Sequence, residues 1–153
     1  MDLTLHTDGG SRGNPGPSGI GFVLEHEGQI VCSGGAFIGT ATNNVAEYEA
    51  LIWGLENARA LGATGIEMIA DSELMVKQIT GAYKIKNAAL KILAARVHGL
   101  LKDFESWSFE HTLRAGNTEA DALVNEALDT QGTAGGPAQD WTATPLSLFP
   151  GKD

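Results

Sequence analysis

Residues Thr7–Leu24, TDGGSRGNPGPSGIGFVL, follow a run in which apolar and polar side chains alternate, and they place Asp8 where that run ends. The alternation predicts a β-strand over residues 2–8, and the glycines and prolines after it predict a turn. Glycine lets a backbone approach a ligand closely and present its N–H groups. A carboxylate beside such a loop can face a phosphate only with a cation between them, so Asp8 is a candidate metal ligand. The alternative is that Asp8 caps the turn through its side chain.

Three further acids stand at the ends of predicted elements. Glu47 lies in the first turn of a long helical pattern, Asp71 follows a short apolar strand, and Asp121 opens the last helix. Each has a structural alternative, because Asn44 with Glu47 and Thr118 with Asp121 have capping-box spacing, and Asp71 fits a helix N-cap. Two acids that end strands and two that open helices nevertheless occupy positions where a sheet can gather side chains into one site.

The order of predicted elements is that of an α/β domain. Strands are expected at residues 2–8, 19–26, 29–37, 66–70 and 107–113, and helices at 44–61, 72–79, 88–104 and 118–128. Glu27–Gly28 would turn a hairpin, and a helical connection would make the fourth strand parallel to the first. Asp8 and Asp71 would then lie at the same end of neighbouring strands. We predict a mixed five-stranded sheet with helices on both faces.

The chain resembles the type 1 ribonuclease H family in four separated blocks that stand in the right order and spacing: DGGSRGNPGP, ATNNVAEYEAL, ADSELMVKQI followed by YKIKN, and RAGNTEADALVNEAL. The resemblance covers residues 1–129. It implies a ribonuclease H-like fold and a metal-dependent endonuclease that cuts the RNA strand of RNA–DNA hybrids, leaving 5′-phosphate and 3′-hydroxyl ends. Two alternatives remain open. One is a nuclease of the same fold that acts on double-stranded RNA or DNA junctions, and the other is a non-catalytic hybrid-binding module.

By the same resemblance, Asp8, Glu47, Asp71 and Asp121 match the four metal-binding acids of the family. Two Mg²⁺ ions about 3.5–4 Å apart can activate a water and stabilise the charges that develop in phosphodiester hydrolysis. Magnesium prefers oxygen ligands, so carboxylates suffice, and we expect Mn²⁺ to be able to substitute. Asp8 is expected to bridge the two ions, with Glu47 and Asp71 mainly on the ion that activates water or lies nearer the RNA strand and Asp121 on the other.

The loop before the last helix departs from the best-known members of the family. Some members carry a mobile histidine there, but Ala115–Gly116 contains none. Arg114 matches the arginine that serves instead in compact relatives, so we count it with the catalytic residues. His6 and His111 fall within strand patterns and are interpreted as structural.

Recognition of RNA requires groups that can pair with its 2′-hydroxyl, which both donates and accepts hydrogen bonds. Side-chain amides and the backbone of the glycine-rich loop provide such groups. The predicted nucleic-acid contacts are Gly9, Gly10, Ser11, Arg12, Gly13, Asn14, Asn43 and Asn44, and the resemblance adds Thr42 at a phosphate of the DNA strand. For any single asparagine, the alternative is an ordinary turn former.

The net charge of −9 is unevenly distributed along the chain. Residues 1–73 carry −8 and residues 103–153 carry −7, whereas residues 74–102 carry +6 without a single acid. This basic segment predicts a local phosphate-binding face, with an ordinary solvated helix face as the alternative. Some members of the family carry a basic extension where Gly81–Asn87 is short. Substrate binding would therefore depend on Lys77, Lys84 and Lys86.

The length of the chain suits a single catalytic domain, placed at residues 1–129. The lone cysteine excludes an internal disulfide, and no signal peptide or membrane-spanning run is recognised, so a cytoplasmic location is predicted. Residues 130–140 have few apolar side chains and predict a flexible linker, followed by an apolar tail at 141–153. Within the tail, Leu146–Phe149 resembles the peptide with which bacterial replication proteins bind the sliding clamp, although Pro145 stands where glutamine is usual. The alternative is that the tail folds back onto the domain.

Overall fold

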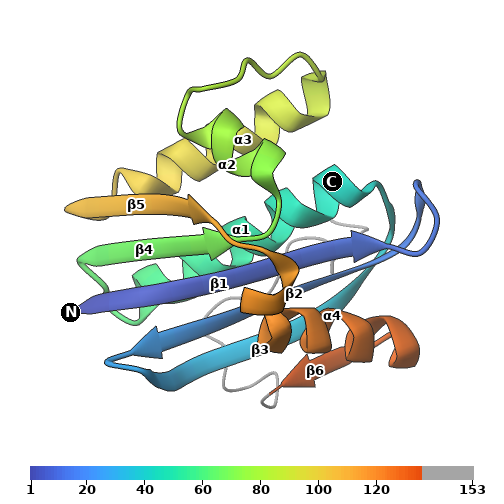
Figure 1. Cartoon of the computed structure of the whole chain (residues 1–153), viewed down its shortest axis with the longest axis horizontal. Coiled ribbons are helices and arrows are strands. Elements are labelled where there is room, and N and C mark those ends of the chain that lie inside the picture. The colour runs from blue at the N-terminus through green and yellow to red at the C-terminus, as the bar shows by residue number, and fades with distance from the viewer. Residues whose placement is uncertain (136–153) are drawn as a thin grey trace.

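The computed structural model describes residues 1–135, and in that region six strands form one mixed sheet in the order β5-β4-β1-β2-β3-β6 (Figure 1). The strands are β1 (Asp2–Ser11), β2 (Gly16–His26), β3 (Gln29–Ala41), β4 (Gly65–Ala70), β5 (Ser106–His111) and β6 (Thr133–Gly135). Strands β1, β4 and β5 are parallel, and the other neighbours are antiparallel. The helices are α1 (Asn43–Ala60), α2 (Glu73–Ile79), α3 (Ala88–Leu101) and α4 (Thr118–Thr130), with a 3₁₀ turn η1 (Arg114–Gly116) before α4.

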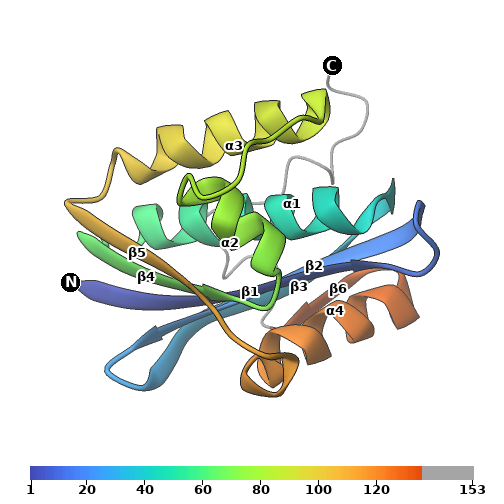
Figure 2. The same ribbon diagram turned by 45° about the horizontal axis from the view of Figure 1, so that its top comes forward.

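Helices cover both faces of the sheet, as predicted. Figure 2 shows α1, α2 and α3 on one face and α4 on the other. The main core lies between the sheet and α1, where Trp53 meets Phe22 of β2 edge to face with ring centroids 4.7 Å apart. Both side chains are buried, so the position of α1 over the sheet is fixed by close packing.

Three glycines let the helices approach the sheet more closely than any other residue would allow. A Cβ atom at Gly9 would collide with the backbone of Ala46 in α1. On the opposite face, a Cβ atom at Gly21 would lie 2.9 Å from the carbonyl oxygen of Ala120, and one at Gly35 would lie 2.7 Å from that of Leu123. The glycine-rich sequence therefore brings both α1 and α4 onto the strands that carry the site.

The parallel pairing of β1 with β4 confirms the predicted meeting of strand ends. Thr7 is the partner of Ala70, so Asp8 and Asp71 follow at the same end of adjacent strands. The predicted hairpin at Glu27–Gly28 is also confirmed, because both residues have positive φ angles, 51° and 81°, as a tight two-residue hairpin turn requires.

The sheet has one strand more than predicted. Residues 130–135 were expected to begin a flexible linker, but Thr130 ends α4 and Thr133–Gly135 forms β6 against residues 34–36 of β3. The prediction was wrong there because a short, glycine-rich stretch has little strand propensity of its own, and β3 supplies the backbone partners. Residues 136–140 and the tail at 141–153, including the predicted clamp contact through Leu146–Phe149, lie outside the described residues.

The helix caps also differ from the predictions. Thr42 and Ser72 cap α1 and α2, because each hydroxyl accepts a hydrogen bond from the backbone N–H three residues later, at 3.2 and 3.3 Å. Asn44 and Asp71 therefore do not cap these helices, and the structural explanation for Asp71 is wrong. None of the helices within residues 1–135 is long and apolar enough to cross a membrane.

Candidate metal centre

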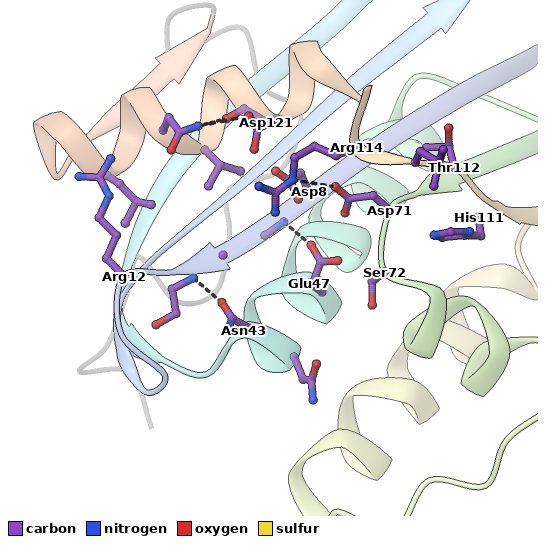
Figure 3. A pocket seen from close by; sticks show the side chains of 18 residues that line it. Asp8, Arg12, Asn43, Glu47, Asp71, Ser72, His111, Thr112, Arg114 and Asp121 are labelled. Atoms are coloured by element: carbon purple, nitrogen blue, oxygen red, sulfur yellow. Dashed lines mark hydrogen bonds and ion pairs between the residues drawn. The ribbon is translucent and has the colours of Figure 1, made fainter. Parts of the chain in front are cut away.

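The four predicted acids line one cleft of about 560 Å³ (Figure 3). Asp8 comes from β1, Glu47 from α1, Asp71 from the end of β4 and Asp121 from the first turn of α4. Asp8, Glu47 and Asp71 each offer one carboxylate oxygen within 4.8 Å of the others. Asp121 stands outside that group of three, but it is close enough for its carboxylate to act on Asp8. The structure thus brings together acids separated by more than a hundred positions.

Burial and the repulsion of neighbouring carboxylates disfavour the charged forms of Asp8 and Glu47. Asp8 and Glu47 are only 6% and 7% exposed. Burial, then the charge of Asp71 and the neighbouring Asp121, raises the pKa of Asp8 to about 8. Burial, then the charges of Asp8 and Asp71, raises the pKa of Glu47 well above its usual range. The group is electrostatically incomplete and would be stabilised by a cation.

The arginines of the cleft do not supply that charge. Arg114 Nε lies 3.9 Å from Asp71 Oδ2, but the Arg114 side chain is 80% exposed and stands at the rim. Arg12 pairs with Asp129 of α4 instead, at 2.6 Å. The donors that converge at the centre are all carboxylate oxygens, which are the ligands that Mg²⁺ and Mn²⁺ prefer. The residues present therefore fit a divalent cation.

The position of Glu47 depends on the glycine that follows Asp8. The backbone N–H of Gly9 donates a hydrogen bond to Glu47 Oε1 at 2.5 Å. This bond forms because Gly9 has no side chain to keep α1 away from β1. It anchors one Glu47 oxygen, so the carboxylate is oriented before any ligand binds.

One wall of the cleft is a hydrogen-bonded loop. The backbone N–H of Ser11 donates to Asn43 Oδ1 at 2.8 Å, and the N–H of Asn43 donates to Asn14 Oδ1 at 3.0 Å. Because Asn43 Oδ1 already accepts the hydrogen bond from Ser11, the side-chain NH₂ group of Asn43 is the part of the amide that is available to a ligand. The loop and the start of α1 are thereby held together beside the acids.

Half of the predicted nucleic-acid contacts line the cleft, together with the predicted catalytic residue Arg114. Those that do are Gly9, Gly10, Ser11, Arg12, Asn43, Asn44 and Arg114. The residues that lie outside it are Gly13, Asn14, Thr42, Lys77, Lys84 and Lys86. Asn14 instead holds Asn43, and the Thr42 hydroxyl caps α1. Lys77 bonds to Glu73 at 2.7 Å and lies 5.0 Å from the centre of the Tyr83 ring, so it is already engaged on the protein.

Several residues of the cleft were not predicted. His111 was interpreted as structural, but it is exposed and lines the cleft, because it pairs with Ala70 directly beside Asp71. Ser72 and Thr112 line the same wall. Asn125 donates to Asp121 Oδ2 at 3.3 Å. Its spacing of four residues from Asp121 on a helix was the signal that could have identified it.

Comparison with known proteins places this architecture among close relatives. A family model described as "Reverse transcriptase-like" matches residues 6–127. The Ribonuclease HI of Halobacterium salinarum is 51% identical over 123 residues, which are 80% of this chain and 62% of that protein. The crystal structure of RNase H1 from the same archaeon is 48% identical with a TM-score of 0.83, covering 85% of this chain and 99% of that one. LC11-RNase H1 in complex with an RNA/DNA hybrid is 43% identical with a TM-score of 0.81, covering 84% and 98% of the two chains.

The repulsion within the cluster predicts that the metal-free protein becomes less stable as the pH rises. Asp8 binds its proton more tightly in the folded state, so its contribution to stability is present below pH 4 and is lost as the pH rises towards about 8. In EDTA at pH 8.5, Asp8→Asn should melt about 5 °C or more above the wild type, and the difference should shrink towards pH 4. Glu105→Gln removes an exposed acid and serves as the control. A wild type that melts as high as Asp8→Asn at pH 8.5 would contradict the repulsion.

A divalent cation should reverse that destabilisation, because it binds the folded cluster and not the unfolded chain. Millimolar Mn²⁺ should raise the melting temperature of the wild type by several degrees at pH 7.5, as expected for a ligand well above its dissociation constant. Asp8→Asn should show a much smaller increase. Thermal melts with and without Mn²⁺ measure both, and an unmoved wild type would exclude a metal site of useful affinity.

Proposed function

This chain belongs to the type 1 ribonuclease H family, and we propose that it hydrolyses the RNA strand of RNA–DNA hybrids with the help of divalent cations. The observation that carries the proposal is the group of largely buried carboxylates, for which residues 1–135 supply no buried cationic side chain and which opens into a cleft lined by amide donors. The hybrid seen in the complex of LC11-RNase H1, a 43% identical relative, supports this substrate. The chain spans 62% of the length of the Halobacterium relative and 36% of a mycobacterial one, so activities of those longer proteins do not transfer as a whole.

The residues that would hold the cations are Asp8, Glu47 and Asp71 as one group, with Asp121 approaching from α4. When bound, two Mg²⁺ ions, or Mn²⁺ in their place, would activate a water and stabilise the phosphoryl and leaving-group charges. Asp8 interacts with each of the other three acids and would hold the cations together with them. Glu47 is held by the N–H of Gly9 and presents an oriented oxygen. The expected products carry 5′-phosphate and 3′-hydroxyl ends.

Selection for RNA would come from the amides on the loop side of the cleft. The NH₂ group of Asn43, fixed by the bond from Ser11 to its oxygen, is available to donate to a 2′-hydroxyl or a base edge. Asn44 and the backbone of Gly9–Ser11 line the cleft beside it. Deoxyribose lacks that acceptor, so a DNA strand would leave the donor unpaired.

Arg114 would act on the phosphate side of the reaction. Its guanidinium stands at the rim, close to Asp71 yet largely exposed, where it can reach a bound phosphate or the leaving oxygen. His111 lines the same part of the cleft. Asp71 is thus positioned by the end of β4. The exposed guanidinium of Arg114 lies beside it but does not neutralise it.

Lys84 and Lys86 would hold the substrate backbone outside the cleft. Both are exposed on the connection between α2 and α3, whereas the intervening Ile85 is partly buried against the core. This alternation fixes the connection to the domain and turns the two ammonium groups outwards. The predicted clamp contact of Leu146–Phe149 and the cytoplasmic location stay predictions from the sequence.

The proposal is tested by incubating labelled RNA–DNA hybrid, RNA duplex and DNA duplex with the protein in Mg²⁺ and in Mn²⁺. We expect cleavage of the RNA strand of the hybrid alone. Asp8→Asn should abolish cleavage and still bind the hybrid, because the amide and lysine contacts remain. Comparable cutting of RNA duplex would favour the alternative of a different substrate, and binding without cutting would favour a non-catalytic module. Near wild-type cleavage by Asp8→Asn would show that the site is wrong.

The two exposed lysines predict a change in the salt dependence of binding. Removal of one lysine that binds a phosphate should reduce the slope of log affinity against log salt by roughly one unit, so Lys84→Ala with Lys86→Ala should lower it by about two. Cleavage at saturating substrate should change little. The matched control is Lys91→Ala with Lys102→Ala, which removes equal charge from the α3 region. Equal slopes for wild type and the Lys84/Lys86 variant would place the binding face elsewhere.

A further inference from the structure

Asn117 joins three parts of the site at one buried point between η1 and α4. Its side-chain NH₂ group donates to the carbonyl oxygen of Thr7 at 2.7 Å. Its backbone carbonyl accepts a hydrogen bond from Asp121 N–H at 3.1 Å, and its backbone N–H donates to the carbonyl of Arg114 at 3.0 Å. Thr7 directly precedes Asp8, so a single residue connects the strand of Asp8 with Asp121 and Arg114. Asn117 is 2% exposed and does not line the cleft.

The need for such a connection follows from the way α4 sits on the sheet. The acids Asp8, Glu47 and Asp71 form one compact group, whereas Asp121 arrives on α4 from the other face. Helix α4 lies on Gly21 and Gly35 of β2 and β3, and these positions fix the height of the helix but offer no side-chain ridge to stop it from sliding. The bond from Asn117 to Thr7 fixes the start of the helix along β1.

The side chain of Asn117 is not used in the way that its place in the chain suggests. Asn117 occupies the N-cap position of α4, whereas the sequence predicted that Thr118 would cap this helix. The side chain of Asn117 nevertheless makes no cap hydrogen bond. Its Oδ1 atom is buried and has no hydrogen-bond partner among the described residues. An asparagine that served only as a cap would turn that oxygen towards the free N–H groups of the helix. Here the NH₂ group is turned to the Thr7 carbonyl of β1 and the oxygen has no partner within residues 1–135, so helix capping does not explain the orientation of this side chain.

We propose that Asn117 is a positioning residue, which sets the distance between Asp121 and the group of Asp8, Glu47 and Asp71 and thereby the affinity for the second cation. This inference rests on the metal-dependent function proposed above. Asn117 touches neither substrate nor cation and acts through Asp121.

The test is Asn117→Ser, because serine caps helices as well as asparagine does but cannot reach the Thr7 carbonyl. Three quantities are measured: the melting temperature in EDTA, the Mn²⁺ affinity by calorimetry without substrate, and kcat and KM on a short hybrid. We expect a melting temperature within a few degrees of wild type and a Mn²⁺ affinity about 10-fold weaker, as for removal of a group that orients a metal ligand. The kcat should fall by a similar factor with KM changed less than about 2-fold. Thr118→Ser, an exposed change in the same turn, is the matched control and should change none of them.

A double-mutant comparison decides whether Asn117 acts through Asp121. In an Asp121→Asn background, Asn117→Ser should weaken Mn²⁺ binding less than about 2-fold, because the ligand that it positions is already absent. An equal loss of affinity in both backgrounds, or unchanged affinity and kcat in a folded Asn117→Ser protein, would overturn the proposal.

If Asn117→Ser does not fold, Asn117→Thr is compared in the same way, because threonine fills more of the space and also caps helices. The calorimetry uses no nucleic acid, so failure to cut hybrids would refute the proposed function without deciding the role of Asn117.

Discussion

Carboxylates that are buried together without a counter-charge repel one another, and the fold must hold them in place against that repulsion. Asp8 sits in the middle of a mixed sheet, and burial together with its neighbours raises its pKa to about 8. The energy that holds the acids together against this repulsion comes from elsewhere, from the packing of α1 on the sheet and the edge-to-face contact of Trp53 with Phe22. The acids are thus placed by strand ends and helix starts whose positions the core determines. Such a cluster is unfavourable in isolation and becomes favourable when a cation enters it.

The backbone makes the cluster possible because it removes side chains where elements must meet. Gly9 lets the first turns of α1 lie directly on β1, and its own N–H then orients Glu47. On the other face, Gly21 and Gly35 let α4 lie against β2 and β3, which brings Asp121 towards Asp8 from the opposite direction. A methyl group at any of these positions would move a whole helix, and with it a ligand. The glycines therefore contribute to the site by setting the distance between the helices and the sheet, and not by contacting a ligand through a side chain.

The parts of the site that sequence could predict are those set by local pattern. Asp8 and Asp71 follow apolar strands, and the helical crossover between those strands makes them parallel, so their proximity follows from general rules. Asn117 was not predictable in the same way, because its partner Thr7 is 110 positions away and its role depends on how α4 sits. β6 was missed for a similar reason, since its strand state comes from the partner strand β3. His111 lies in a strand, as predicted, but the pairing of β5 with β4 places it beside Ala70, so it also lines the cleft.

The separation of negative and positive charge has a consequence for the order of binding. The acids of the cleft would repel a phosphate until cations are present, whereas Lys84 and Lys86 stand outside it and would attract the backbone independently. Over distances beyond about 8–10 Å these interactions are screened at physiological salt, so the net charge of −9 matters less to a docked strand than the nearest lysines do. Within the cleft, a phosphate and a cation would each provide the charge that the other needs. Linkage then requires that each tighten the binding of the other by the same factor. A hybrid held by the lysines would thus increase the affinity of the carboxylates for their cations at the place where the scissile phosphate arrives.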